Sequence, residues 1–268
     1  MLKEILKIVV ATGIIIVLIH IIHALTLDRI IQYKEISFSS SNIPPAMNGY
    51  RIAFVSDTHF LSEDDLWEVV AEINQRQVDL LILGGDLILA EDIMRRKVQI
   101  LAQVETVDGI FGVEGNHDYY VHLFAAMEEN GIIPLSNSGQ YIRDRFYLAG
   151  VADPSNRHSC VASAIAGSTS DDFVLLISHQ PDVAMEQNTV GIDLILSGHT
   201  HGGQINFFGI WAPYFTLRDN VTSYGQRFRS GWALSRDGVP VFVSNGVGEY
   251  LPRVFARPQV ILLTLYYE

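Results

Sequence analysis

Five mainly apolar runs of strand length each lead directly into Asp, Asn or His, and this pattern restricts the fold more than any other feature. Longer segments with helical spacing of apolar residues separate the first three runs, which favours a parallel sheet with helices on its faces. Ligands bind to such sheets at the carboxyl ends of the strands. We therefore expect one sheet edge to gather the polar residues of the five strand ends: Asp57, His59, Asp86, Asn116, His117, Asp118, His179, His199 and His201.

The order of the expected elements gives the fold class. Strands dominate the second half of the chain, where only short helices near 159–166 and 182–187 fit between them. A second sheet packed on the first would use these strands, giving a four-layer α/β/β/α sandwich of two mixed sheets. Strands are expected at 51–56, 79–84, 110–114, 141–142, 146–151, 172–178, 192–197, 239–244 and 259–266, and longer helices at 63–77, 92–106 and 119–130.

A long uncharged run, Ile8 to Leu27, precedes these elements. It is about long enough to cross a roughly 30 Å hydrocarbon layer, so we interpret it as a single N-terminal transmembrane helix that anchors the chain in the cell membrane. A cleaved signal peptide is the alternative, because Lys3 and Lys7 precede the run. The length of the run and the lack of an A-x-A site disfavour this alternative.

Positive charges flank both ends of the run, since Arg29 and Lys34 follow it, and the side of the membrane that holds the main domain stays open. The expected division of the chain is an anchor over 1–27, a linker with an edge strand over 28–49 and the main domain over 50–268. His20 and His23 lie near the far end of the run, where we interpret them as interfacial side chains.

The net charge of −12 argues against nucleic acid as a partner, because proteins that bind its phosphate backbone carry basic surfaces. The same excess of carboxylates is compatible with bound cations. Mixed carboxylate and imidazole ligands suit Mn, Fe or Zn rather than Mg or Ca. A shared carboxylate can bridge two such ions, which polarise a phosphoryl group and turn a bound water into a hydroxide nucleophile. The strand ends therefore predict a site for two divalent metal ions.

At these residues the sequence resembles the calcineurin-like metallophosphoesterases. Their pattern is D-x-H, then G-D-x-x-[DE], G-N-H-[DE], a lone His and G-H-x-H. The matching positions here are Asp57 with His59, Gly85 with Asp86, Gly115 to Asp118, His179, and Gly198 to His201. The resemblance spans residues from about 50 to 266 and implies the same four-layer fold.

The resemblance also implies a role for each matching residue. Asp57, His59 and His201 would hold the first metal ion. Asn116, His179 and His199 would hold the second, and Asp86 would bridge the two. His117 would face the substrate as a catalytic residue, and Asp118 would orient the His117 imidazole through a hydrogen bond.

The second motif departs from the family pattern at one position. Leu89 occupies the slot where the family has an acidic residue, which puts the tuning of the site in doubt more than metal binding itself. Glu91 lies two residues further along the chain and is a candidate substitute for that acidic residue.

The expected activity is hydrolysis of a phosphodiester, phosphomonoester or pyrophosphate bond in a phosphorylated small molecule or a lipid-linked substrate close to a membrane or cell envelope. The anchor, the segment SGHTHGGQI that contains the last family motif, and the closing segment NGVGEYLPRVFARPQVILLTL resemble a bacterial membrane-associated subgroup of the family. That subgroup includes phosphodiesterase-like members and an anchored UDP-2,3-diacylglucosamine diphosphatase of lipid A synthesis. Cleavage of that nucleotide lipid is one alternative. A membrane scaffold that has lost catalysis is an alternative of a different class.

Several residues outside the motifs admit two interpretations each. The aromatic run from Phe207 to Phe215 is either core packing or an exposed lip that holds an acyl chain or enters the bilayer interface. Arg157 and Arg253 are more typical of structural pairing than of phosphate binding. His122 and His158 are more typical of surface histidines than of site residues.

Overall fold

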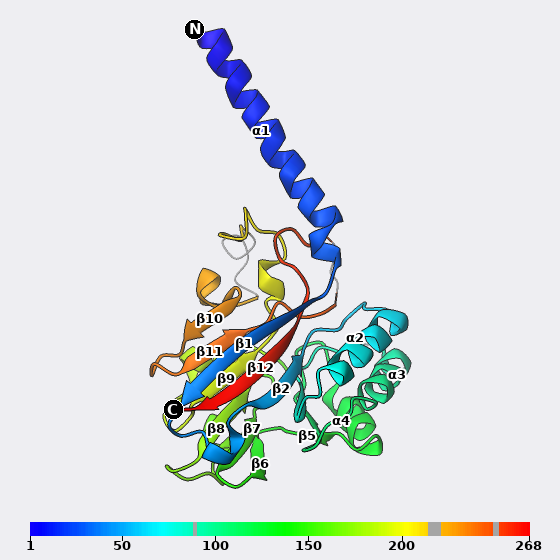
Figure 1. The fold of residues 1–268 in the computed structure, drawn as a ribbon, viewed down its shortest axis with the longest axis vertical. Coiled ribbons are helices and arrows are strands. Elements are labelled where there is room, and N and C mark those ends of the chain that lie inside the picture. Colours follow the sequence, from blue (N-terminus) through cyan, green and yellow to red (C-terminus); the bar gives the residue numbers. More distant parts are fainter. Residues whose placement is uncertain (88–89, 214–220, 249–251) are drawn as a thin grey trace.

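The structure, a computed structural model, describes residues 1–87, 90–213, 221–248 and 252–268. Leu89, Tyr214 and Phe215, which the sequence singled out, lie outside the described residues. Two six-stranded sheets form the centre of the molecule (Figure 1). In order across the first sheet, the strands are β1 (Gln32–Ser40), β12 (Gln259–Tyr267), β2 (Tyr50–Val55), β3 (Leu80–Leu83), β4 (Ile110–Gly112) and β5 (Ile133–Pro134).

The second sheet is also mixed, with a parallel centre and antiparallel outer strands. In order, its strands are β10 (Gly231–Leu234), β11 (Pro240–Val243), β9 (Leu194–Ser197), β8 (Phe173–Ile177), β7 (Phe146–Gly150) and β6 (Ser138–Arg143). The two sheets pack face to face through a dry layer of large side chains that includes Phe54, Phe111, Phe146, Phe173 and Phe242. This arrangement confirms the expected sandwich of two mixed sheets.

Helices cover the outer faces of both sheets. Three longer helices, α2 (Glu63–Gln75), α3 (Glu91–Leu101) and α4 (Tyr120–Glu129), bury their apolar sides on the first sheet. Two short helices, α5 (Val161–Ala164) and α6 (Val183–Glu186), pack on the second. Single turns of 3₁₀ helix lie at Leu27–Arg29, Pro45–Met47, His201–Gly203 and Gly225–Phe228. The four expected layers are therefore present.

The helix expected at 92–106 ends earlier than its apolar spacing suggested. The sequence predicted a helix to residue 106, whereas α3 ends at Leu101. The side chain of Asn74 explains the difference: its amide donates to the carbonyl of Gln103, and its oxygen accepts the backbone N–H of Glu105. These two hydrogen bonds occupy the carbonyl of Gln103 and the N–H of Glu105, which a further helical turn would need for its own hydrogen bonds.

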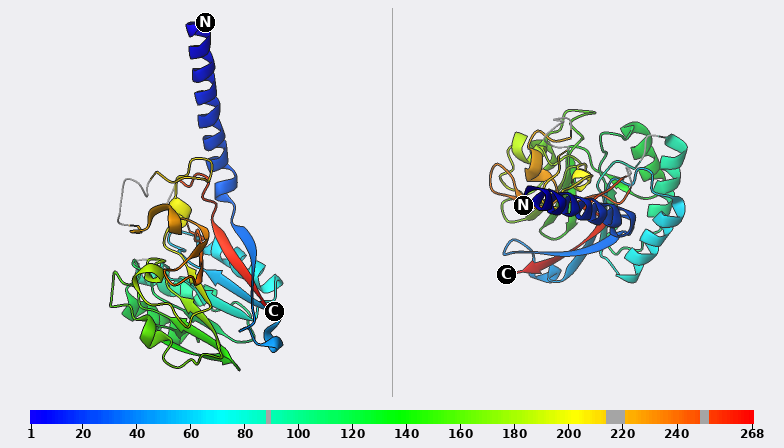
Figure 2. Two further views of the ribbon diagram at one scale, coloured as in Figure 1. Left: turned by 90° about the vertical axis from the view of Figure 1, so that its left-hand side faces the viewer. Right: turned by 90° about the horizontal axis from the view of Figure 1, so that it is seen from above.

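The strand register places the carboxyl ends of β2, β3 and β4 on the side of the first sheet where α1 (Leu2–Leu25) joins the domain. Lys34 of β1 pairs with Ile261 of β12, which in turn pairs with Phe54 of β2. Because β12 runs parallel to β1 and antiparallel to β2, the end of β2 lies on the same side of the sheet as the start of β1. β1 in turn follows α1 after one 3₁₀ turn. Figure 2 shows α1 leaving the domain at this end, and none of its residues is buried.

Candidate metal centre

Two groups of potential metal ligands meet at the carboxyl ends of the strands. One group contains Asp57, His59 and His201, and the ligand atoms within it lie within 4.8 Å of one another. The other contains Asp86, His179 and His199, and it meets the same 4.8 Å limit. The six residues follow four different strands, β2, β3, β8 and β9, as the sequence pattern predicted.

The Asp86 carboxylate lies between the two groups. Its Oδ2 atom is 3.5 Å from His59 Nε2 in the first group and 3.3 Å from His179 Nε2 in the second. The side-chain oxygen of Asn116 lies 3.2 Å from the same His179 nitrogen. On the other side, His59 Nε2 and His201 Nε2 are 3.2 Å apart. The seven predicted ligands thus form one continuous cluster.

The backbone at these strand ends adopts conformations that side chains other than glycine usually avoid. Asp57, Asp86, His199 and His201 have positive φ values of 54°, 57°, 70° and 49°. Each such residue costs free energy of order 1 kcal/mol or more, and such conformations concentrate at functional sites. The strands that precede these residues fix where the four strained positions lie.

Glycines let these strand ends approach one another closely. A Cβ atom added at Gly115 would lie 2.2 Å from Asp86 Oδ1, and one added at Gly198 would lie 2.4 Å from Asp57 Oδ2. Real Cβ contacts are not this short. The two glycines therefore allow the chain to pass directly behind the carboxylates of the cluster.

Burial and neighbouring charges set the protonation of the cluster. Burial lowers the pKa of His59 to about 4 and that of His199 to about 3, so both imidazoles are neutral near pH 7. Burial and then the Arg253 guanidinium hold the pKa of His201 well below its usual value. Burial alone would raise the pKa of Asp86, but the His179 imidazole and its hydrogen bond hold it well below its usual range.

This donor set fits a pair of divalent metal ions. Neutral imidazoles offer a lone pair and ionised carboxylates offer negative charge. Burial alone would lower the pKa of His179, but the carboxylates of Asp86 and Asp57 raise it well above its usual value, so a metal ion that binds there would displace a proton from this ring. The carbonyl of Gly84 accepts a hydrogen bond from His179 Nδ1 at 2.7 Å, which leaves Nε2 directed at the cluster. A hydrogen bond of this kind commonly orients a metal-binding imidazole.

Backbone groups hold the Asp86 and Asp118 carboxylates. The backbone N–H of His117 donates to Asp86 Oδ1 at 2.8 Å. The Asp118 carboxylate accepts the backbone N–H groups of Asp86, Leu87 and Gly115 at 2.7 to 2.9 Å. Burial, then the charge of Asp86, raises the pKa of Asp118 to about 7. Asp118 thus ties together the loops that follow β3 and β4, and its expected hydrogen bond to the His117 imidazole stays a prediction.

Sequence reasoning missed a buried lysine beneath the cluster. Lys97 is 1% exposed, and its ammonium group donates to the carbonyls of Thr58, His59 and Leu87. It thereby joins the backbone after β2 to the backbone after β3. Burial lowers the pKa of Lys97 to about 8. A signal was present in the sequence, because Lys97 shares a helical face with Met94, Val98 and Leu101, where an apolar residue is expected.

Other candidates have structural partners. Glu91, the possible substitute for the acidic slot, is exposed and pairs with Arg95 and His122. Arg157 pairs with the buried carboxylate of Glu114. His158 is exposed.

Arg253 is buried and donates to the carbonyls of Asn245, Gly248 and Ala256. Its Nη2 atom also lies 3.3 Å from His201 Nδ1, so the side chain that the sequence assigned to structural pairing packs directly behind a predicted ligand.

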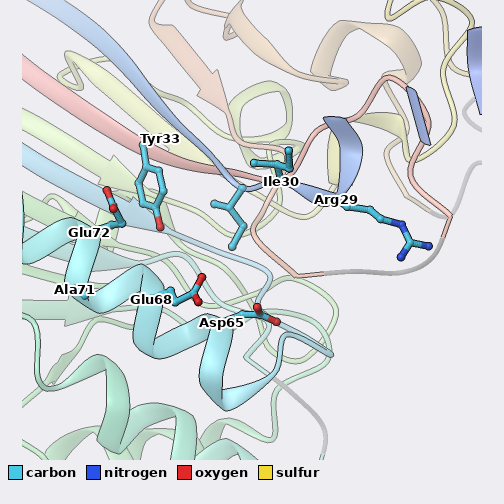
Figure 3. A pocket seen from close by; sticks show the side chains of 8 residues that line it. Arg29, Ile30, Tyr33, Asp65, Glu68, Ala71 and Glu72 are labelled. Carbon is cyan, nitrogen blue, oxygen red and sulfur yellow. The ribbon is translucent and has the colours of Figure 1, made fainter. Parts of the chain in front are cut away.

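A separate hollow lies between the start of β1 and α2 (Figure 3). It has a volume of about 590 Å³ and is lined on one side by Arg29 and Tyr33 and on the other by Asp65, Glu68 and Glu72. None of the predicted ligands lines it. The three carboxylates of α2 disfavour a phosphate in this hollow, so the metal centre is the better candidate site for an anionic group.

Comparisons with known proteins point in the same direction. The profile of a family described as calcineurin-like phosphoesterase matches residues 50–203. YkuE of Bacillus subtilis, named as a metallophosphoesterase, is 27% identical over 255 residues, which are 88% of this chain and 86% of that protein. A transmembrane protein with a metallophosphoesterase domain from Bos taurus is 31% identical over 252 residues, 83% of this chain and 54% of that protein.

The chain thus spans about half the length of the bovine relative. One solved crystal structure aligns with a TM-score of 0.50 at 11% identity, covering 75% of this chain and 91% of that chain. That likeness concerns the fold alone.

Proposed function

Because the chain belongs to the calcineurin-like metallophosphoesterase family, and is therefore a phosphoester hydrolase, we propose that it uses two divalent metal ions to hydrolyse a phosphodiester, phosphomonoester or pyrophosphate bond at a membrane surface. The observation that carries the proposal is the pair of adjacent ligand groups, with the Asp86 carboxylate 3.5 Å from His59 Nε2 of one and 3.3 Å from His179 Nε2 of the other. The proposed division assigns Asp57, His59 and His201 to one ion, Asn116, His179 and His199 to the other, and Asp86 to both.

The chemistry of the site follows from this division. Two ions bound there would polarise the phosphoryl group and lower the pKa of a water molecule. The chain supplies the placement, since the ligands follow five strand ends and several of them have strained backbone. His117 is proposed to face the substrate, stabilise phosphoryl oxygens and protonate the leaving oxygen. Its backbone N–H already holds Asp86, which supports a place for its ring beside the ions.

The membrane part of the proposal rests on α1. It is long and apolar enough to cross a bilayer, and a signal sequence would pass the same test. Its last turn, however, makes specific contacts with the domain: His23 pairs with Asp28, which is buried and accepts the backbone N–H groups of Phe255 and Ala256. These contacts, and the transmembrane protein among the relatives, favour a permanent anchor.

Removing the shared carboxylate tests the proposal. In Asp86→Ala, metal content should fall and turnover of bis-p-nitrophenyl phosphate should drop roughly a thousandfold, because the ions supply several kcal/mol of transition-state stabilisation. Asp64→Ala, which alters an exposed carboxylate on α2, is the matched control and should keep full activity. Unchanged turnover in Asp86→Ala would exclude the proposed centre. A wild-type protein that binds metal but hydrolyses nothing would support the non-catalytic scaffold instead.

A substrate comparison addresses the nucleotide lipid. The metal-loaded protein is assayed in parallel with UDP-2,3-diacylglucosamine and with bis-p-nitrophenyl phosphate. Cleavage of the first at its pyrophosphate would identify the chain with the lipid A activity that its anchor and C-terminal motifs resemble. Activity on the soluble diester alone would remove that alternative and leave the general phosphoesterase proposal standing.

A further inference from the structure

A turn beside the metal centre carries an unusual set of side chains. Residues 205–211 read INFFGIW, and they begin shortly after the predicted ligand His201. Ile205, Phe207, Ile210 and Trp211 are 43%, 48%, 78% and 45% exposed. The described part of the aromatic run is therefore a surface lip rather than core packing. We call Ile205, Phe207, Phe208, Ile210 and Trp211 the apolar rim.

The backbone of this turn would normally be built from small polar residues. Phe207 and Trp211 pair across it, with the Phe207 N–H donating to the Trp211 carbonyl at 2.7 Å. Phe208 and Gly209 at its tip have φ values of 51° and 71°. Gly, Asn and Asp are the usual residues in such conformations because they tolerate positive φ and water. Phe and Ile at this tip indicate an apolar environment.

The rim contacts the end of α1. The His20 ring stacks on Phe207 at 5.4 Å between centroids and meets Phe208 and Phe255 edge-on at 4.6 and 5.0 Å. The Phe208 N–H donates to His20 Nε2 at 3.4 Å, while His20 Nδ1 donates to the Ile16 carbonyl at 2.8 Å. One tautomer of the ring satisfies both bonds. The rim and α1 thus form one apolar surface.

The position of His20 along the helix fixes the depth of the rim. His20 lies five residues before Leu25, where α1 ends. At about 1.5 Å of rise per residue, the rings that touch it reach roughly 7.5 Å back along α1 from its end. Amphipathic elements lie about 5–10 Å deep at the boundary between headgroups and acyl chains. A rim that contacts His20 therefore lies at this depth whenever α1 spans the bilayer.

Hydrogen bonds couple the rim to the metal centre. The buried Asn206 amide donates to the carbonyls of Gly202 and Phe255, and Arg229 donates to its oxygen. Gly202 directly follows the predicted ligand His201. The rim cannot shift far without moving the segment that holds this ligand.

We propose that the apolar rim inserts into the headgroup–acyl boundary of the bilayer and holds the metal centre open toward the headgroup layer, so that the substrate is a phosphoester or pyrophosphate presented at the membrane surface. The proposal rests on the proposed function, and specifically on α1 as an anchor. The occupant of the rim is the lipid bilayer, as the continuity of the rim with α1 indicates.

The three tryptophans give a matched test in the full-length protein. Trp67, Trp211 and Trp232 are 42%, 45% and 48% exposed, so exposure alone does not distinguish them. Trp232 contacts Phe38, which lies about 20 Å along β1 from its start beside α1. Two variants, W67F/W232F and W67F/W211F, leave only Trp211 or only Trp232, and both are reconstituted in vesicles of phosphatidylcholine with or without bromine on the acyl chains near the headgroup.

Brominated lipid should quench the fluorescence of Trp211 by about twofold or more and should leave Trp232 unchanged, whereas aqueous iodide should show the opposite preference. Ile210→Asp, added to the Trp211 protein, should abolish lipid quenching because it places a charge at the tip of the turn. Val190→Asp is its control, since Val190 is 67% exposed and precedes β9 at the opposite edge of the sheet.

Equal quenching of the two tryptophans by lipid, or iodide access to Trp211 as free as to Trp232, would overturn the proposal. Two measurements on the same samples keep the proposed function separate. Resistance to alkaline carbonate extraction reports on α1 as an anchor, and metal-dependent turnover of bis-p-nitrophenyl phosphate reports on the metal centre. Loss of either result would contradict the proposed function, whereas an aqueous Trp211 in an anchored, active protein would contradict the rim alone.

Discussion

Lys97 shows how a single residue can support a site that it does not enter. Its ammonium group joins the backbone carbonyls of Thr58 and His59 to that of Leu87, and thus links two of the strand ends that carry predicted ligands. Among the described residues, the hydrogen-bond partners of this group are backbone carbonyls. The positive charge therefore acts on backbone oxygens, whose positions determine where Asp57, His59 and Asp86 point.

Removing this charge should loosen the metal centre. Lys97→Met keeps the aliphatic stem but leaves buried carbonyls without a donor, which costs about 1–3 kcal/mol for each unsatisfied group. We expect a lower metal content and a turnover of bis-p-nitrophenyl phosphate reduced by about 10 to 100-fold, as for other residues that support ligands from behind.

Arg96→Met is the matched control, because it removes the positive charge of the neighbouring residue, which lies on the exposed face of α3. The two variants are compared by metal analysis and by kinetics at saturating metal. If Lys97→Met retained wild-type metal content and activity while Arg96→Met did the same, the support that we assign to Lys97 would be wrong.

At the scale of single residues, the sequence was informative wherever chemistry required a motif. The strand ends indicated the members of both ligand groups, although β2 and β3 belong to the first sheet and β8 and β9 to the second, so the carboxyl ends of two packed sheets meet at the cluster. The support behind the ligands was harder to predict. Lys97 interrupts an apolar helical face, which marks its position, but this spacing does not indicate the carbonyls of Thr58, His59 and Leu87 to which it donates. Arg253 donates to carbonyls of nearby residues, and a lone arginine leaves no spacing pattern in the sequence.

At the scale of elements, the junction between α1 and β1 depends on one side chain, that of Asp28. Asp28 is 1% exposed and joins three groups: the His23 imidazole and the backbone N–H groups of Phe255 and Ala256. The charge of one carboxylate thereby fixes the end of α1 to the loop that precedes β12.

Asp28→Ala should release this junction. Without the carboxylate, the buried N–H groups of Phe255 and Ala256 lose their acceptor, which costs about 1–3 kcal/mol. Since cleavage of a native protein follows local opening, trypsin should cut after Arg29 about tenfold faster or more. The rate is measured by mass spectrometry on the full chain in detergent. Asp171→Ala, at an exposed loop position, should leave the cleavage rate unchanged, and equal rates in all three proteins would contradict the proposed strength of the junction.

Most elements of this fold follow from apolar periodicity, and the exceptions have local causes. Of the strands that lead into predicted ligands, β3, β4, β8 and β9 lie within the predicted ranges because they are continuous runs of buried residues, and β2 begins one residue early, at Tyr50. β5 and β10 were missed because the first has two residues and the second, Gly231–Leu234, alternates between half-buried and exposed positions. The early end of α3 depends on Asn74, a side chain from a different helix, which periodicity cannot reveal.

For the whole molecule, bound metal should be a large part of the stability. The site buries the carboxylates of Asp57 and Asp86 side by side, and a bound cation would offset their mutual repulsion and loss of hydration. Ions at a hundredfold excess over their dissociation constant stabilise the folded state by about 2.7 kcal/mol. Removing them with a chelator should therefore lower the melting temperature by roughly 5–10 °C for a chain of this size.

The measurement compares the full chain before and after chelation, and again after metal is restored. Asp86→Ala serves as the reference, because its melting temperature should no longer respond to chelator. A wild-type melting temperature that chelation does not change would mean that the cluster holds no ions in solution, and the proposed centre would lose its physical basis.

The arrangement of the whole molecule was predicted only in part. Alternating elements indicated two packed sheets, and they are present. The sequence placed an edge strand next to the apolar N-terminal run but gave no indication of its partner. That partner is β12, and the pairing turns the metal-binding edge toward α1. Long-range strand pairing depends on the fit of two distant segments, which the periodicity of either one alone does not contain.

The pairing of β1 with β12 also orders events during synthesis. β1 emerges from the ribosome soon after α1, yet the strand with which it pairs among the described residues is the one at 259–267. At roughly 5–20 residues per second, β1 waits on the order of ten seconds or more for that partner. Throughout this interval its edge is open while the preceding helix is already available to the membrane. Pairing with β12 therefore covers a strand edge of β1 that chaperones, proteases and other nascent chains could reach until then.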